Sequence, residues 1–176
     1  MKIKILTLAL PLALFAANAN AGTLMDVYVG ATIGAGAATL FADGQSNTDT
    51  AQSYGAMIGL DIPLIRLEAE YNYLNDIDTR LNLGMVNAYF KMPATVILPY
   101  LGLGVGSVFG GKSDNVDINA NAAYQGMLGV TFDTPALPLK IDLEGRVLYA
   151  PNIYNINGVR PDLLHYDARV KLRYVF

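Results

Sequence analysis

The stretch His165–Phe176, HYDARVKLRYVF, decides the fold because its apolar and charged residues alternate. The even positions are all apolar or aromatic, whereas the odd positions up to Arg173 carry ionisable side chains. A period of two residues predicts a β-strand with one apolar and one charged face. Aromatic residues stand at both ends of the apolar face, with Tyr166 at one end and Tyr174 and Phe176 at the other. This placement fits the two interfaces of a membrane, about 25 Å apart.

Two further segments show the same alternation. In residues 64–75, apolar side chains alternate with Arg66, Glu68 and Glu70. In residues 139–149 they alternate with a second charged set, Lys140, Asp142, Glu144 and Arg146. The segments also resemble each other, LIRLEA at 64–69 and KIDLEG at 140–145, which places two equivalent strands half a barrel apart. A duplicated half-barrel and the general likeness of barrel strands account equally well for this repeat.

The whole chain divides into eight strand segments, 26–41, 52–61, 64–75, 80–92, 96–109, 121–132, 139–149 and 165–176. The connections at 61–63, 93–95 and 133–138 are short and contain proline, which ends strand pairing. The connection at 76–79 is also short, whereas those at 42–51, 110–120 and 150–164 are longer and rich in polar residues and glycine. We therefore predict an all-β fold, an eight-stranded antiparallel up-and-down transmembrane β-barrel, closed so that no strand edge faces lipid.

The composition excludes several other classes of protein. Of the 176 residues, 53% are hydrophobic and only 15% are charged, yet no run of 18 apolar residues offers a membrane helix. The absence of cysteine excludes a disulfide framework and a cysteine zinc site. The sequence pI of about 5.0 is opposite in sign to that of a nucleic-acid-binding surface. We expect no nucleic-acid partner, no cofactor and no metal site.

Residues 1–21 are interpreted as a secretory signal peptide. Lys2 and Lys4 form a positive region, residues 5–17 form an apolar region, and Ala19-Asn20-Ala21 offers a cleavage site, with a weaker one at 17–19. A membrane anchor is the alternative, but an apolar run this short cannot cross about 30 Å of hydrocarbon. The predicted domains are therefore the signal peptide at 1–21 and an outer-membrane barrel at 22–176.

Two central motifs resemble those of a known family. The sequence VNAYF at 86–90 is followed by PYLGLGVG at 99–106, and this order resembles the central signature of the opacity-protein-like and outer-membrane-protein-A-like small barrels. The opening YVGA at 28–31 and the closing YVF at 174–176 are also similar. The resemblance covers most of the mature chain and implies an eight-stranded barrel. The family is functionally diverse, with roles in adhesion, envelope integrity and lipid modification.

The last strand departs from this family at one position. The assembly signal there usually carries glycine five residues before the terminal aromatic residue, where this chain has Lys171. We therefore expect insertion to depend on Tyr174 and Phe176. We assign the aromatic girdles to four further tyrosines, Tyr71, Tyr73, Tyr149 and Tyr166.

The lumen of an eight-stranded barrel has just enough room for side chains. The alternation projects eleven charged residues into it, Arg66, Glu68, Glu70, Lys140, Asp142, Glu144, Arg146, Asp167, Arg169, Lys171 and Arg173. An unpaired charge in this space is costly, whereas a paired network is tolerated. We predict a charge-paired network that closes the lumen, and a gated proton or ion path is the alternative. Gly102, Gly104 and Gly106 share one face and are expected to make room for long charged side chains from the opposite wall.

Catalytic interpretations have less support. Glu68 and Glu70 would form a carboxylate pair, but both point into a closed lumen. His165 is expected to be solvated at the rim of the last strand, and nothing in the sequence brings Ser53 or Ser107 into contact with it. A Ser–His–acid site of a lipid A deacylase or acyltransferase is therefore a minor alternative.

The function favoured by these features is non-enzymatic. We expect an integral barrel in the outer membrane of a Gram-negative bacterium, with periplasmic termini and extracellular long loops, acting in envelope structure or in surface binding and adhesion. A small porin-like channel is the first alternative and a lipid A-modifying enzyme the second. Expected partners are outer-membrane lipid and lipopolysaccharide, periplasmic chaperones, the barrel assembly machinery and a surface ligand of unknown nature. Divalent ions bridging loop aspartates to lipopolysaccharide phosphates are a further hypothesis.

Overall fold

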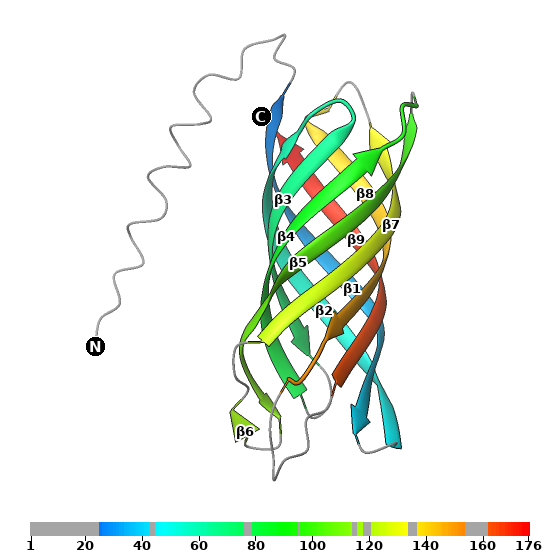
Figure 1. Cartoon of the computed structure of the whole chain (residues 1–176). Helices are drawn as coiled ribbons and strands as arrows, with labels where there is room; N and C mark the ends of the chain where they lie inside the picture. The colour runs from blue at the N-terminus through cyan, green and yellow to red at the C-terminus, as the bar shows by residue number, and fades with distance from the viewer. Residues whose placement is uncertain are drawn as a thin grey trace, which may run out of the picture.

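The structure, a computed structural model, consists of β-strands (Figure 1). It describes residues 25–42, 45–75, 79–94, 96–113, 116–117, 121–133, 137–153 and 162–176, so the predicted signal peptide lies outside the described residues. The strands are β1 (Asp26–Ala42), β2 (Gln45–Asp61), β3 (Ile65–Asn75), β4 (Thr79–Lys91), β5 (Ile97–Ser113), β6 (Val116–Asp117), β7 (Asn121–Asp133), β8 (Leu139–Ala150) and β9 (Asp162–Val175). Among these described residues, no helix is long and apolar enough to cross a membrane.

Eight strands close into a ring in which every neighbouring pair is antiparallel. The order is β4-β3-β2-β1-β9-β8-β7-β5, and pairing between β4 and β5 completes the circle. The first and last strands pair from Tyr28↔Val175 to Phe41↔Asp162. The short strand β6 pairs with the end of β5. The predicted eight-stranded up-and-down barrel is therefore confirmed.

The two ends of the barrel differ. At one end, which we call the turn end, the connections 62–64, 92–96 and 134–138 are short, and the described chain begins and ends there (Figure 1). At the other end, which we call the loop end, lie the connections between β1 and β2, β3 and β4, β5 and β7, and β8 and β9. A strand of 11 residues such as β3 is about 36 Å long. At a tilt of about 40° it rises roughly 28 Å, close to the thickness of a bilayer core.

The predicted loop at 42–51 is wrong, because β2 already begins at Gln45. It pairs with β1 as far as Ala42↔Gln45, and the hydroxyls of Thr39 and Thr48 lie 2.9 Å apart across the two strands. The segment QSNTDT at 45–50 is polar at every position, so it has no alternation from which a strand could be recognised. Strands β5 and β9 likewise extend beyond their predicted bounds, to Ser113 and from Asp162.

The two segments of the internal repeat lie on opposite walls. β3 and β8 are separated by three strands in either direction around the ring. Arg66 of β3 donates a hydrogen bond across the lumen to Asp142 of β8, at 3.0 Å. Each segment therefore faces the other.

Candidate functional site

The lumen is the part of the molecule with the richest chemistry. Alternation along each strand turns one set of side chains inward, as in β9, where buried and exposed residues alternate from Leu163 to Tyr174. Ten of the eleven predicted charged residues are buried there, and Lys140 is partly exposed at the turn end. The lumen has two regions, a charge network from the turn end to Asp167 and an apolar plug at the loop end.

The middle of the charge network is built around Glu68. This carboxylate accepts hydrogen bonds from the hydroxyls of Tyr28 and Tyr89, at 2.8 and 2.9 Å, and from the amide of Asn87 at 3.2 Å. Lys171 lies 3.1 Å away on the far wall. Four donors therefore surround one buried negative charge, which is the condition under which a buried carboxylate is tolerated.

Glu144 has a similar environment on the opposite side of the lumen. Arg169 donates to it through two nitrogens, Tyr100 donates at 3.0 Å, and Lys171 lies 3.3 Å away. Arg169 also reaches Glu70 at 2.7 Å. Arg169 therefore joins β9 to both β8 and β3, which are on different walls.

Nearer the turn end, Asp142 takes the central position. Arg173 binds both of its oxygens, at 2.8 and 2.9 Å, in the bidentate geometry that is the strongest form of this contact. Arg66 lies 3.0 Å from the same carboxylate, and its guanidinium carbon is 4.0 Å from the ring centroid of Tyr89 and 4.6 Å from that of Tyr100. Two nitrogens of Arg66 have no hydrogen-bond partner among the described residues. The two aromatic faces therefore provide the remaining attraction for this buried cation.

At the turn end, the network reaches the opening of the barrel. Asp61 lies against Lys91, 3.2 Å from Arg173 and 3.6 Å from Lys140. Lys140 also lies 3.2 Å from Asp133, whose side chain is partly exposed. These residues connect the buried network with the aqueous side of the turn end.

The network ends toward the loop end at Asp167. Arg146 binds both of its oxygens, at 2.9 and 2.7 Å, and Ser53 donates to it at 2.6 Å. His165 Nε2 lies 3.2 Å from the same carboxylate, yet neither ring nitrogen has a hydrogen-bond partner among the described residues. The prediction of a solvated His165 is wrong, since the side chain is fully buried beside Leu148 and Ala38.

The hydroxyl, carboxylate and imidazole of this cluster do not form a nucleophilic triad. Ser53 and His165 both approach Asp167 Oδ2, so the carboxylate lies between them. In a triad the imidazole lies between the hydroxyl and the acid, because it has to accept the hydroxyl proton. All three side chains are buried, which also removes access for a substrate.

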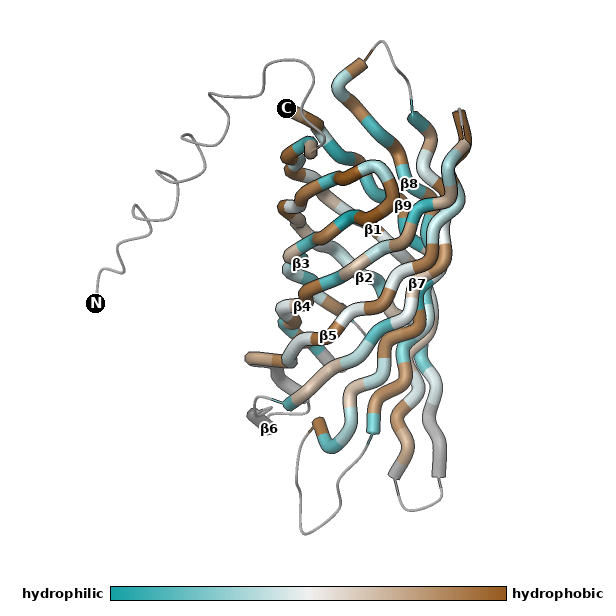
Figure 2. Tube along the Cα trace, turned by 45° about the horizontal axis from the view of Figure 1, so that its top comes forward, coloured by the Kyte–Doolittle hydropathy of each residue, from teal (hydrophilic) through white to brown (hydrophobic). Residues whose placement is uncertain are grey.

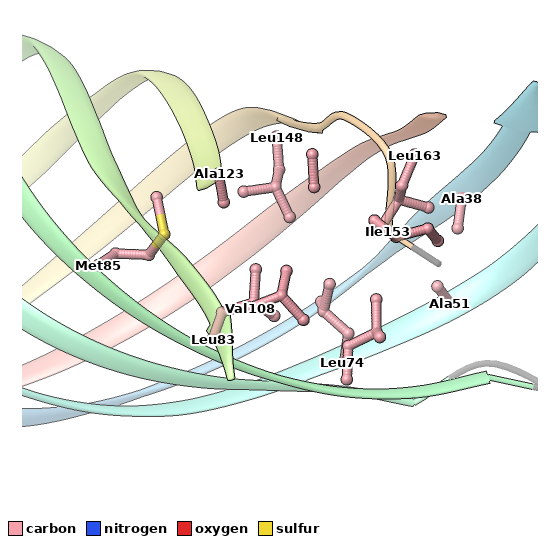
Figure 3. Packing of buried hydrophobic residues seen from close by; sticks show 12 residues of the cluster. Ala38, Ala51, Leu74, Leu83, Met85, Val108, Ala123, Leu148, Ile153 and Leu163 are labelled. Carbon is pink, nitrogen blue, oxygen red and sulfur yellow. The ribbon is translucent and has the colours of Figure 1, made fainter. Parts of the chain in front are cut away.

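The apolar plug was not predicted from the sequence. It consists of buried side chains near the loop ends of the strands, Ala38, Ala51, Leu74, Leu81, Leu83, Met85, Val108, Ala123, Leu148, Ala150, Ile153 and Leu163 (Figure 3). A cavity of about 20 Å³ remains among them, with His165 in its lining. This volume is enough for about one water molecule. The lumen is therefore closed at the loop end by packing rather than by charge.

Several members of the charge network were also not predicted. Tyr28, Tyr89 and Tyr100 point inward, and so do Asn87 and Asp61. The parity of each strand would have identified them, because Asn87 and Tyr89 share the inward positions of β4 with Lys91. The predicted reason for the inward glycines, room for side chains from the opposite wall, is wrong. A Cβ on Gly104 would lie 2.1 Å from Asn87 of the adjacent strand. Gly104 makes room for its neighbour rather than for the opposite wall.

The outer wall is apolar and carries the predicted aromatic residues. Hydrophilic and hydrophobic positions alternate along the strands (Figure 2), and outward residues such as Leu103 are as much as 75% exposed. Tyr71, Tyr149 and Tyr166 are exposed and Tyr73 is partly exposed. At the turn end, the exposed rings of Tyr174 and Phe176 contact each other, with centroids 5.1 Å apart.

The site offers few groups for a metal or a cofactor. No cluster of three metal-ligating side chains occurs within the described ranges. Each of the six buried carboxylates already contacts two or more donors of the protein itself. The arrangement is therefore suited to closing and cross-linking the barrel rather than to binding an ion.

Comparisons with known proteins agree with this fold. No protein-family model matches the chain, and the search of curated proteins found no match. Among solved structures, the chain is similar to Neisserial surface protein A, with a TM-score of 0.63 and 20% identity over 85% of this chain and 97% of that one. It is also similar to the outer membrane protein OprG from Pseudomonas aeruginosa, with a TM-score of 0.52 and 11% identity over 86% and 95% of the two chains.

A third similar structure is that of an enzyme. The outer membrane enzyme PagL matches with a TM-score of 0.50 and 13% identity over 82% of this chain and 97% of that one. Identities this low establish the fold alone. The chain therefore has the fold of the small eight-stranded outer-membrane barrels, among which both enzymes and other proteins occur.

Proposed function

We propose that this chain is an integral outer-membrane protein with a closed lumen and no enzymatic activity, which acts in envelope structure or by binding ligands at its loop end. The observation that carries this proposal is the filling of the lumen, by the charge network over most of its height and by the apolar plug at the loop end. An apolar outer wall with aromatic residues toward both ends supports the membrane location.

The proposal favours a closed barrel over a small porin. A porin needs a continuous water-filled path, whereas here Arg169, Lys171 and Arg66 cross the lumen to carboxylates on the far wall. Each of these contacts would have to break for a hydrated ion to pass. Separating these pairs would leave buried charges without partners, which is unfavourable, so the geometry favours the closed state.

The proposal also favours a non-enzymatic protein over a lipid A-modifying enzyme. The support is the spatial arrangement, in which the Asp167 carboxylate lies between the Ser53 hydroxyl and the His165 imidazole, together with the burial of all three side chains. Mass spectrometry of lipid A from cells with and without the gene tests this point. We expect identical lipid A profiles, and a species that has lost or gained an acyl chain with the gene present would overturn the assignment.

We propose that the turn end faces the periplasm and the loop end the cell exterior. Periplasmic chaperones and the barrel assembly machinery are the partners expected during insertion. The exposed aromatic pair of Tyr174, in β9, and Phe176, directly after β9, is the proposed recognition element. Replacing both by alanine should reduce the folded outer-membrane fraction and leave material in the periplasm, whereas replacing Val170 by alanine on the same wall serves as the control.

Fractionation and gel mobility test the membrane location. Protein extracted from the outer membrane should migrate faster unboiled than boiled, because a closed barrel resists SDS. Normal outer-membrane levels of the Tyr174→Ala/Phe176→Ala double variant would show that assembly is specified elsewhere. Recovery of the wild-type chain only from soluble fractions would overturn the proposed function itself.

A further inference from the structure

The outer wall of the barrel carries an exposed cation at the loop end. Arg80, near the start of β4, is exposed, whereas Leu81 and Leu83 of the same strand point into the lumen. Among side chains that the structure describes, every other lysine or arginine lies in the lumen or at its turn-end opening, paired with carboxylates. Arg80 has no such ion pair within the described ranges. Among the side chains that the structure describes, Arg80 is therefore the basic residue that remains available to a partner outside the barrel.

Polar residues surround Arg80 across four strands. In the register of the sheet, Arg80 lies opposite Asn75 of β3 on one side and opposite Lys112 of β5 on the other. Asn75 in turn lies opposite Gln52 of β2, which is exposed. These four positions, Gln52, Asn75, Arg80 and Lys112, form one row across the strands, which we call the polar row.

An aromatic belt lies directly beneath the polar row. The next row toward the turn end contains Tyr54, Tyr73 and Asn82. Tyr71 donates a hydrogen bond to Asn82 at 2.6 Å and packs against Phe109 with ring centroids 6.0 Å apart. Two residues of strand separate Arg80 from Asn82, which corresponds to about 7 Å. Aromatic rings of this kind mark the headgroup level of a bilayer, so Arg80 lies within or just above the headgroups.

We propose that the polar row around Arg80 binds the phosphate of a lipid in the surrounding leaflet. This inference rests on the proposed function, under which the loop end lies in the outer leaflet and the lipid is phosphorylated lipopolysaccharide. The charge is complementary, and a guanidinium group presents two parallel donors that match two phosphate oxygens. The amides of Asn75 and Gln52 add neutral donors in the same row, and the tyrosines below it contact the adjoining sugar and acyl carbons.

Binding of purified lipids to the folded chain tests the proposal. The wild-type protein in detergent, verified by its fast migration when unboiled, is titrated with diphosphoryl lipid A and with dephosphorylated lipid A, and bound lipid is counted by native mass spectrometry. We expect tighter binding of the phosphorylated lipid. Arg80→Gln should weaken that binding about three- to tenfold, the range for a charge-assisted contact at an exposed position. Arg80→Lys should weaken it less, and Thr50→Ala, at an exposed position of β2 outside the polar row, should not change it.

Four outcomes would overturn the proposal. Unchanged binding by Arg80→Gln, or equal wild-type affinity for dephosphorylated lipid A, would remove the role of the arginine or of the phosphate. Displacement of the lipid by inorganic phosphate would assign the row to a free anion. Binding that EDTA abolishes equally in wild type and Arg80→Gln would assign it to bridging metal ions. Because the barrel's location is measured separately by fractionation, its absence from the outer membrane would contradict the proposed function without affecting this assay.

Discussion

The two regions of the lumen close the same barrel by different physical means. In the charge network, side chains such as Glu68 and Arg169 span opposite walls through hydrogen bonds and ion pairs. In the apolar plug, at the loop end, side chains such as Leu83 and Leu148 fill the lumen by van der Waals contact alone (Figure 3). The stability of the network depends on every buried charge having its partner, whereas the stability of the plug depends on apolar side chains filling the available volume. Variants in the two regions should therefore fail in different ways.

The position of each region follows from what it contacts. The network reaches the aqueous opening at the turn end through Asp61 and Lys140, so its charges are continuous with water on that side. The plug separates Asp167 and Arg146 from the loop end. The charges of the polar interior can thus remain paired toward the turn end, and apolar packing fills the opposite end.

The largest effect is expected from removing one carboxylate of the network. Glu144→Ala leaves Arg169 and Lys171 with one fewer acid partner and the hydroxyl of Tyr100 without its acceptor. A lost partner in a buried pair costs about 3–5 kcal/mol. We expect a free energy of unfolding lower by this amount in urea titrations of the folded barrel. Thr50→Ala, at an exposed position of β2, should leave the unfolding midpoint where it is.

A somewhat smaller effect is expected from creating a cavity in the plug. Leu83→Ala removes a fully buried side chain, which typically costs about 2–5 kcal/mol. Leu103→Ala on the outer wall removes the same atoms from a side chain that is 75% exposed, and it should cost much less. If both leucine variants lower the unfolding free energy equally, packing inside the plug does not contribute as described.

Loss of one hydrogen bond in the network should rank third. Tyr28→Phe keeps the ring but removes the hydroxyl that donates to Glu68 at 2.8 Å. A hydrogen bond to a charged group is worth about 1.5–3 kcal/mol. Tyr54→Phe, which removes an exposed hydroxyl bonded to Gln52, is the matched control and should have little effect. Similar losses for the two variants would mean that burial adds nothing to the Tyr28 contact.

The smallest net effect is expected when a buried pair is replaced as a unit. Arg146→Met with Asp167→Leu removes both charges of one bidentate pair next to the plug. Such replacements are often neutral, so the double variant should lie within about 2 kcal/mol of wild type, whereas either single variant should lose about 3–5 kcal/mol. A double variant as unstable as the sum of the singles would show that this pair does more than satisfy its own charges.

The sequence predicts the charge network better than the plug, for a physical reason. Where one face is charged and the other apolar, as in β9, alternation identifies the inward residues directly. In the loop-end half of β4 the pattern is reversed, with Leu81 and Leu83 inside and Arg80 outside, so the polar face no longer marks the lumen where the plug begins. Residue type alone does not identify the inward tyrosines, because tyrosine also forms the girdles. Only the parity of Tyr28 and Tyr100 within their strands distinguishes them from girdle residues.

The burial of His165 depends on tertiary contacts that its own strand does not encode. Its place near the loop end of β9 suggests solvent exposure, but Leu148 of β8 and Ala38 of β1 flank it and Leu163 shares the lining of the adjoining cavity. Only the arrangement of the whole ring shows that the plug covers it.

Closure of the lumen is the central claim of this account, and electrical recording tests it most directly. Purified, folded wild-type protein is inserted into planar lipid bilayers and the current is recorded at constant voltage, with a protein-free bilayer as reference. Since the charge network and the apolar plug together fill the lumen, we predict no steady openings above the reference current. Steady openings of large conductance would contradict the closed lumen and would favour the small-porin alternative.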